Sequence, residues 1–313
     1  MKVGLLFSGQ GAQQVDMGMD LYDALPAYKE RIDQASQVLG YDLTEVMTDE
    51  VKIKQTEFAQ PAIVAMSLGI LAALGDALPK PTAALGLSLG EYSALTAAGA
   101  MDFDQVIAIL KDRGHYMQAV GDKNPGKMVA VMGDDQDLIV RVFKECQDKG
   151  LQVWPANFNT FSQLVIGGVT ADVEEAVGEL LAAGIKRTID LPVTGAFHTP
   201  LLNEAAEQLG SRLSSEKFNN LDYLVYSNTT AKPFESQEIK EVLTKQIVSP
   251  TYFAQDLQQM VDAGVDTLIE IGPGKTLTKF AKKIAPKEIE RLNIGDLTSF
   301  EETKAFLEDA AKG

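Results

Sequence analysis

The amino-acid sequence predicts an α/β fold: an α/β-hydrolase-like large domain with a parallel sheet, into which a small ferredoxin-like subdomain is inserted. Two observations support this prediction. Short apolar runs alternate with longer helical segments along most of the chain, which is typical of a parallel sheet covered by helices. Near the middle, the expected order changes to β-α-β-β-α-β over about 65 residues, the order of a ferredoxin-like unit. We therefore predict a large domain of residues 1–126 and 194–313 and a small subdomain of residues 127–193.

Length and composition narrow the class of protein. The 313 residues suffice for one large domain with an insertion. The formal net charge of −16 argues against general nucleic-acid binding, because no basic stripe offsets it. Cys146 is the one cysteine, so the chain cannot form an internal disulfide. The apolar run that ends at Phe7 is too short for a signal peptide and the apolar segment 63–74 is too short for a membrane span, so we expect a cytoplasmic protein.

The first half of the large domain begins with a short apolar strand. The expected elements are strand Lys2–Phe7, a helical region from Met17 to Leu39, a buried helix that opens at Gln60-Pro61, strand Pro81–Leu87, helix Glu91–Ala98 and helix Asp102–Val120. Both strands are mostly apolar, as strands buried on both faces should be. The turn Ser8-Gly9-Gln10-Gly11 is not a dinucleotide fingerprint, because Gln14 stands where the third glycine would be.

The insertion and the rest of the large domain follow in order. The insertion is expected to contain strand Lys127–Met132, helix Gln136–Lys149, strands Leu151–Phe158 and Ser162–Gly167, helix Asp172–Ala183 and strand Arg187–Val193. The large domain resumes with a helix after Pro200, strand Leu221–Ser227, helices Glu238–Val248 and Tyr252–Ala263, strand Thr267–Ile271 and a basic helix with Lys279, Lys282 and Lys283. Gly274-Lys275-Thr276 resembles the end of a phosphate-binding P-loop. Ile269 stands where a P-loop has its first glycine, so we predict a strand-to-helix turn without a nucleotide site.

The centre of the predicted chemistry is Ser88, in the run Gly86-Leu87-Ser88-Leu89-Gly90. This run has the Gly-x-Ser-x-Gly spacing of a nucleophile elbow, and it lies where a buried strand meets a helix. One glycine flanks a serine in a strained conformation, and the other lets the helix pass close to the strand. The spacing therefore predicts an exposed hydroxyl beside the positive end of a helix.

A serine of ordinary pKa needs a base, and the chain has two histidines. His115 falls within an expected helix, whereas His198 lies in a loop where the chain re-enters the large domain, so His198 is the better candidate. No acid clearly completes a Ser-His-Asp set, since Asp190 belongs to the last strand of the insertion; a backbone carbonyl can orient the ring instead. The N–H of Leu89 is the natural first donor to an oxyanion, and the second is expected from the loop Gly9-Gln10-Gly11.

Several separate motifs occur in a characteristic order along essentially the whole chain. They are Phe7-Ser8-Gly9-Gln10-Gly11-Ala12-Gln13, Gln60-Pro61-Ala62, Gly86–Leu95, Arg113-Gly114 with Met117-Gln118, Asn157-Phe158-Asn159 with Gln163, Phe197-His198, Gln246 with Ser249-Pro250, and Glu270–Lys275. In these motifs the sequence closely resembles the malonyl-CoA:acyl carrier protein transacylases of fatty-acid synthesis. Two positions depart from that family's pattern: Leu87 replaces a frequent histidine that is not the base, and Ser8 replaces a proline, which should mainly affect loop stiffness.

The resemblance implies roles for the catalytic residues. Ser88 would attack a thioester and become malonylated. His198 would act first as general base and then as general acid. The main-chain carbonyl of Gln246 would orient the His198 ring, which explains the missing carboxylate. The backbone N–H groups of Gln10 and Leu89 would bind the oxyanion.

The resemblance also implies that Arg113 binds the free carboxylate of the malonyl group. A guanidinium on a buried helix face is costly unless it is paired, and a carboxylate can pair with it through two hydrogen bonds. From the residues alone, a salt bridge from Arg113 to Asp112 or Asp104 is an equal alternative.

The implied reaction is ping-pong transfer of malonyl from malonyl-CoA to the phosphopantetheine thiol of acyl carrier protein, which supplies fatty-acid chain elongation. No metal or bound cofactor is implied, and we expect a monomer that binds neither nucleic acid nor membrane. Because acyl carrier proteins are acidic, we expect a basic docking patch of Lys186, Arg187, Lys275, Lys279, Lys282 and Lys283. The alternatives are a serine thioesterase or other hydrolase, an acyltransferase of a polyketide or malonate-decarboxylase system, and a non-catalytic docking subunit.

Overall fold

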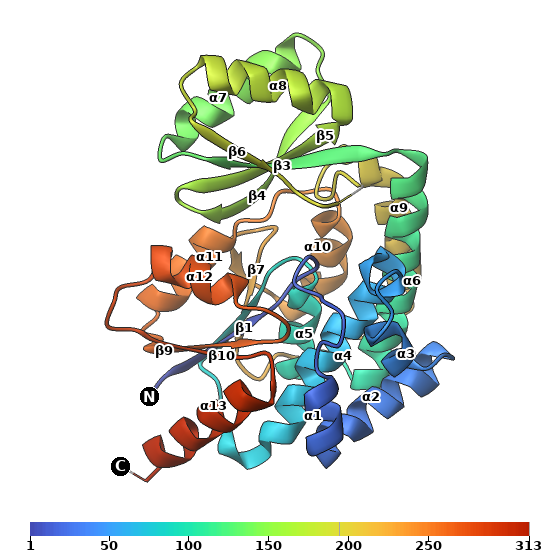
Figure 1. Ribbon diagram of the computed structural model, residues 1–313, viewed down its shortest axis with the longest axis vertical. Helices are drawn as coiled ribbons and strands as arrows, with labels where there is room; N and C mark the ends of the chain where they lie inside the picture. The colour runs from blue at the N-terminus through green and yellow to red at the C-terminus, as the bar shows by residue number, and fades with distance from the viewer. Residues whose placement is uncertain (194, 313) are drawn as a thin grey trace.

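The computed structural model describes residues 1–193 and 195–312 and contains a six-stranded and a four-stranded sheet. Figure 1 shows the larger sheet with most of the helices at one end of the long axis and the smaller sheet, covered by two helices on its outer side, at the other. The predicted α/β fold class is confirmed. The boundary predicted at residue 194 and the last residue, 313, lie outside the described residues, and the division into domains stays a prediction.

The large sheet is parallel except at one edge. Its strands are β1 (Val3–Phe7), β2 (Ala83–Gly86), β7 (Leu224–Ser227), β8 (Lys232–Pro233), β9 (Thr267–Ile271) and β10 (Glu290–Ile294), in the order β10-β9-β1-β2-β7-β8. Only β8 runs antiparallel to its neighbour. At the carboxyl ends of the central strands, Phe7 is paired with both Gly86 and Ile271. The turns that follow β1, β2 and β9 therefore meet at one edge of the sheet, where open α/β sheets bind ligands.

Helices cover both faces of the large sheet (Figure 1). They are α1 (Met19–Ala24), α2 (Pro26–Leu39), α3 (Leu43–Met47), α4 (Thr56–Leu74), α5 (Gly90–Ala97), α6 (Phe103–Lys123), α9 (Asn203–Leu213), α10 (Ile239–Gln246), α11 (Phe253–Asp262), α12 (Thr276–Ile284) and α13 (Leu297–Ala310). Successive side chains of β1 alternate between the faces: Leu5 and Phe7 join the core with α4, α5 and α6, whereas Leu6 joins the core with α11 and α12.

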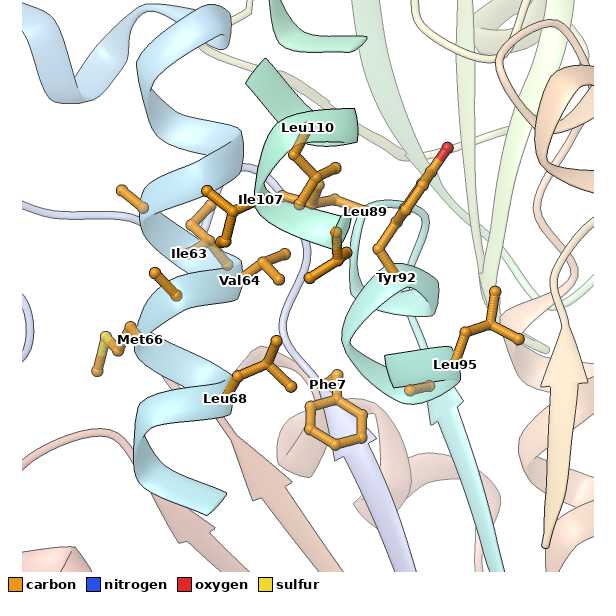
Figure 2. Packing of buried hydrophobic residues seen from close by; sticks show 14 of the residues in the cluster. Phe7, Ile63, Val64, Met66, Leu68, Leu89, Tyr92, Leu95, Ile107 and Leu110 are labelled. Carbon is orange, nitrogen blue, oxygen red and sulfur yellow. The ribbon is translucent and has the colours of Figure 1, made fainter. Parts of the chain in front are cut away.

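Helix α4 forms the centre of the larger core. In Figure 2, Val64 and Leu68 of α4 point toward Phe7 at the end of β1 and toward α5. Within residues 1–193 and 195–312, the helical stretch Thr56–Ala77 is the one long and apolar enough to cross a membrane by length and composition alone, and 72% of its most apolar window is buried inside the protein. Such burial is also typical of the core helix of a globular protein.

The small sheet is antiparallel and follows the predicted order of elements. Its chain order is β3 (Gly126–Met132), α7 (Gln136–Asp148), β4 (Val153–Thr160), β5 (Gln163–Val169), α8 (Thr170–Ala182) and β6 (Arg187–Asp190), and its strand order is β4-β5-β3-β6. Strand β4 contacts the segment between α10 and α11. The N–H of Phe158 donates to the carbonyl of Thr251 at 2.7 Å, and the rings of Phe158 and Tyr252 stack with centroids 5.1 Å apart.

Two elements after the basic helix were not predicted from the sequence, strand β10 and helix α13. Strand β10 lies at the sheet edge, and most of its residues are only half-buried. It therefore lacks the continuous apolar run that marks the inner strands. Helix α4 also begins earlier than predicted, at Thr56, with Pro61 inside it.

Two glycines let the turn between β2 and α5 pack against the end of β1. A Cβ on Gly86 would lie 1.9 Å from the carbonyl carbon of Gly90, and a Cβ on Gly90 would lie 2.2 Å from the carbonyl oxygen of Phe7. Both partners are main-chain atoms, so no side-chain rotation can relieve either clash. The predicted close approach of helix and strand is therefore present in the structure, and it requires both glycines, although it was predicted for only one of them.

We expect Gly86→Ala to lower the free energy of unfolding by roughly 3 kcal/mol or more, because overpacking costs about 1–3 kcal/mol even where neighbours can shift. Urea unfolding followed by circular dichroism measures this loss. Gly178→Ala in α8 is the matched control, because a Cβ at Gly178 meets no atom within 4 Å. The control should be as stable as the wild type or slightly more so. Equal unfolding midpoints for the two variants would contradict the packing argument.

Candidate active site

Ser88 lies in the turn between β2 and α5 with a left-handed backbone, φ +52°. Its main chain is held from two sides: the N–H donates to Oδ1 of Asn228 at 2.6 Å, and the carbonyl accepts Nε2 of Gln246 at 3.0 Å. The side chain is partly exposed. A left-handed conformation is strained for a residue other than glycine, and these two hydrogen bonds hold it.

His198 contacts the Ser88 hydroxyl directly. Its Nε2 lies 2.7 Å from Oγ of Ser88, and its Nδ1 lies 2.8 Å from the carbonyl oxygen of Gln246 and 3.1 Å from that of Ser249. A carbonyl oxygen can only accept, so Nδ1 carries the proton and Nε2 is free to accept one from Ser88. Burial lowers the pKa of His198 from 6.5 to about 4, although its bond to the Gln246 carbonyl acts in the opposite direction. At neutral pH the ring is therefore uncharged and its Nε2 can accept a proton.

The other titratable candidates lie away from this pair. His115 has an exposed side chain, with Nδ1 3.5 Å from a Glu57 carboxylate oxygen. Asp190, on β6, forms a 2.9 Å ion pair with Lys127. In the part of the chain that the structure describes, no carboxylate accepts a hydrogen bond from His198, so backbone carbonyls orient the ring.

Arg113, on α6, is 1% exposed, and among the described residues its side chain forms hydrogen bonds with neutral partners only. Nη1 donates to Oε1 of Gln60 at 2.7 Å and Nη2 to Oε1 of Gln246 at 2.9 Å, and its guanidinium carbon lies 5.2 Å from the centroid of the Tyr92 ring. Burial lowers the pKa of Arg113, while Tyr92 and Glu91 act to raise it. Its Nε finds no hydrogen-bond partner within the described part of the chain.

The two acids considered for a salt bridge with Arg113 have other partners. Asp112 bonds to Arg212, and Asp104 accepts from Gln34 at 2.6 Å. No carboxylate of the described residues lies within 4 Å of the Arg113 guanidinium. A buried cation that is solvated only by amide oxygens can take an anionic ligand through its remaining N–H groups.

The two candidate oxyanion donors lie in turns that touch. A Cβ on Gly9 would lie 2.3 Å from the carbonyl oxygen of Leu87, so the turn after β1 packs against the elbow. Among residues 1–193 and 195–312, the N–H groups of Gln10 and Leu89 donate to no protein acceptor. The Gln10 side chain is fixed, because its Nε2 donates to Oγ1 of Thr56 at 2.9 Å. Both N–H groups therefore remain candidates for binding an oxyanion.

Asn228 and Glu91 belong to the site but were not predicted to. Asn228 follows β7 and holds the N–H of Ser88; its own N–H donates to Oε1 of Glu91 at 2.5 Å. Glu91 is fully buried in the first turn of α5. The sequence contains one signal for it, a carboxylate in a helix of otherwise small and apolar residues directly after the elbow. Across the described ranges, no cluster of three side chains suited to a metal ion occurs.

Comparisons with known proteins agree on one group of relatives. Residues 5–303 match the family model described as acyl transferase domain. The malonyl CoA-acyl carrier protein transacylase of Bacillus subtilis (strain 168) is 36% identical over 286 residues, which are 90% of each chain. The crystal structure of MCAT from Streptococcus pneumoniae is 42% identical with a TM-score of 0.93, covering 98% of this chain and all of that one. A malonyl-transacylase solved in complex with its type II PKS acyl-carrier protein is 33% identical, with a TM-score of 0.93 and coverage of 98% and 100%.

We expect the rate at which a fluorophosphonate probe labels Ser88 to stay nearly constant from about pH 8 to about pH 5 and to fall below that range. A general base works only when it is neutral, so labelling is lost as the pH falls through the folded-state pKa of His198, which is about 4. Intact-mass measurement over time gives the rate. His115→Ala should leave the profile unchanged, whereas His198→Ala should slow labelling by about 100-fold or more. An inflection near 6.5 would contradict the effect of burial.

Proposed function

This chain belongs to the family of acyl transferase domains, and we propose that it uses Ser88 and His198 to carry a malonyl group from malonyl-CoA to acyl carrier protein. It is an acyl carrier protein S-malonyltransferase that supplies malonyl groups for fatty-acid chain elongation. One observation carries the residue assignment: Ser88 Oγ lies 2.7 Å from Nε2 of His198, and Gln246 links this pair to the buried cation Arg113.

The first half-reaction forms a malonyl-serine ester. Nε2 of His198 takes the proton of Ser88 as Oγ attacks the thioester carbonyl of malonyl-CoA. The N–H groups of Gln10 and Leu89 stabilise the negative charge that develops on the carbonyl oxygen. When the tetrahedral intermediate collapses, the carbon–sulfur bond breaks and His198 returns the proton to the departing sulfur, so coenzyme A leaves as a thiol.

The second half-reaction runs the same chemistry with a new thiol. The phosphopantetheine thiol of acyl carrier protein gives its proton to His198 and attacks the ester, and Ser88 recovers its proton as the leaving group. A carrier protein is supported as partner by the relative that was solved in complex with one. The proposed docking patch for this acidic partner consists of exposed basic residues, Lys279, Lys282 and Lys283 of α12 with Lys186, Arg187 and Lys275. The monomeric state, the cytoplasmic location and the lack of a cofactor stay predictions.

Arg113 supplies the selectivity for a malonyl group in this proposal. The malonyl carboxylate would place a negative charge beside a guanidinium that has only neutral partners. An acetyl group offers no such charge, and it would leave the buried cation unpaired. Malonyl is favoured over acetyl because hydrogen bonds between two charged groups are stronger than those between Arg113 and neutral partners.

Two alternatives lead to different acceptors. Hydrolysis would use the same serine and histidine with water as the second nucleophile, so the acceptor must be tested directly. A carrier of polyketide synthesis is a specific second candidate, because one relative was solved with a type II PKS acyl-carrier protein.

We expect wild-type protein mixed with malonyl-CoA to gain the mass of one malonyl group and Ser88→Ala to gain none, because the ester forms on this hydroxyl. Intact-mass spectrometry measures both. The adduct should disappear on addition of phosphopantetheinylated acyl carrier protein and persist with the unmodified carrier. A wild-type protein without an adduct would count against the proposal, and an adduct lost equally fast in buffer alone would favour hydrolysis.

We expect Arg113→Ala to lower the ratio of malonyl to acetyl kcat/KM by about 100-fold, since hydrogen bonds to charged groups contribute about 1.5–3 kcal/mol each. Rates of Ser88 acylation by the two thioesters give the ratio. Arg113→Lys should fall between the wild type and Arg113→Ala, because lysine keeps the charge but not the two-pronged geometry. An unchanged ratio in Arg113→Ala would remove the role assigned to this residue.

A further inference from the structure

Gln246, at the end of α10, joins the two halves of the site. Its main-chain carbonyl accepts Nδ1 of His198 at 2.8 Å, and its side-chain oxygen accepts Nη2 of Arg113 at 2.9 Å. Its Nε2 donates to the Ser88 carbonyl at 3.0 Å and also to Oε2 of Glu91. The side chain is fully buried, so water does not compete for these partners.

The Gln246 amide could be reversed with almost no change of shape, so its neighbours must decide its orientation. Arg113 can only donate hydrogen bonds, and the Ser88 carbonyl can only accept them. An ionised Glu91 is also an acceptor only. Together these groups require the amide oxygen to face Arg113 and the NH2 group to face Ser88 and Glu91. A reversed amide would point the NH2 group of Gln246 at the N–H groups of Arg113, so that donors would face donors.

Glu91 is itself held in place. It lies in the first turn of α5, where the helix dipole favours a negative charge, and Oε1 accepts the N–H of Asn228 at 2.5 Å. Burial raises the pKa of Glu91 to about 8, while the bonds from Asn228 and Gln246 and the charge of Arg113 act to lower it. Each carboxyl oxygen accepts an N–H donor, which favours the ionised form against the effect of burial, and near pH 8 the ionised and protonated forms are present in similar amounts. The described structure has no ion pair between Glu91 and Arg113.

We propose that Glu91 is a positioning residue for acyl selectivity: its carboxylate fixes the Gln246 amide, and the fixed amide oxygen aims the Arg113 guanidinium at the carboxylate of the acyl group. Glu91 thus acts on the substrate through Gln246 and Arg113 and not by contact with it. The inference rests on the proposed role of Arg113.

The test compares malonyl and acetyl transfer to Ser88, as a ratio of kcat/KM, in five variants. Glu91→Gln keeps the volume but removes the charged acceptor that holds the Gln246 NH2 group, so the amide is held less firmly and the ratio should fall by about tenfold. Gln246→Met removes the amide while keeping the main-chain carbonyl for His198, and it should lower the ratio by a similar factor. Because Glu91 acts through Gln246, the double variant should fall no further than Gln246→Met alone.

Asp256→Asn is the matched control. Asp256 is a second buried carboxylate of the same network; its Oδ2 accepts Nδ2 of Asn228 at 3.1 Å, but it does not contact Gln246. Both variants replace a buried carboxyl group near the elbow by an amide, but only Glu91→Gln alters a hydrogen-bond partner of Gln246, so only Glu91→Gln should change the ratio. Equal falls in both variants would overturn the proposal.

Three further results would overturn the proposal. An unchanged ratio in Glu91→Gln is the first, and additive effects in the double variant are the second. If Glu91→Gln does not fold, an unchanged ratio in Gln246→Met is the third. Arg113→Ala separates this inference from the proposed function. If Arg113→Ala lowers the ratio and Glu91→Gln does not, only the positioning role of Glu91 fails. If Arg113→Ala leaves the ratio unchanged, the proposed selectivity fails as well.

Discussion

The left-handed backbone of Ser88 is the constraint around which this site is built. A residue other than glycine in such a conformation costs about 1–3 kcal/mol, and the two hydrogen bonds to its N–H and carbonyl contribute about 1 kcal/mol each. They come from Asn228 after β7 and from Gln246 at the end of α10, so elements far apart in the sequence must meet before the serine is held. In this conformation the Oγ of Ser88 lies 2.7 Å from Nε2 of His198.

The absence of a carboxylate beside His198 in the described structure has an electrostatic benefit. A carboxylate that oriented the ring would also lie near Arg113 in a buried, low-dielectric site. It would neutralise the guanidinium and compete with the carboxylate of an acyl group. Orientation by the carbonyls of Gln246 and Ser249 gives His198 the required tautomer without a further carboxylate beside Arg113, the proposed ligand of the acyl carboxylate.

Two residues of the candidate site could be predicted because one lies in a short sequence motif and the other belongs to a residue type that is rare in this chain. Ser88 is marked by two glycines within five residues, and His198 by the presence of only one other histidine. Asn228 and Glu91 could not be assigned, because their roles depend on hydrogen bonds between residues more than a hundred positions apart. Strand β10 was missed for a different reason: a half-exposed edge strand needs no apolar run, so its sequence looks like a loop.

The two connections to the small sheet run side by side, so close that a Cβ on Gly126 would lie 2.7 Å from that of Ala196. One connection continues the helix that carries Arg113, and the other leads into the loop that carries His198. Ser88 belongs to neither, since it is anchored on β2 in the large sheet. A tilt of the small sheet about these connections would therefore move Arg113 and His198 together relative to Ser88, the proposed nucleophile.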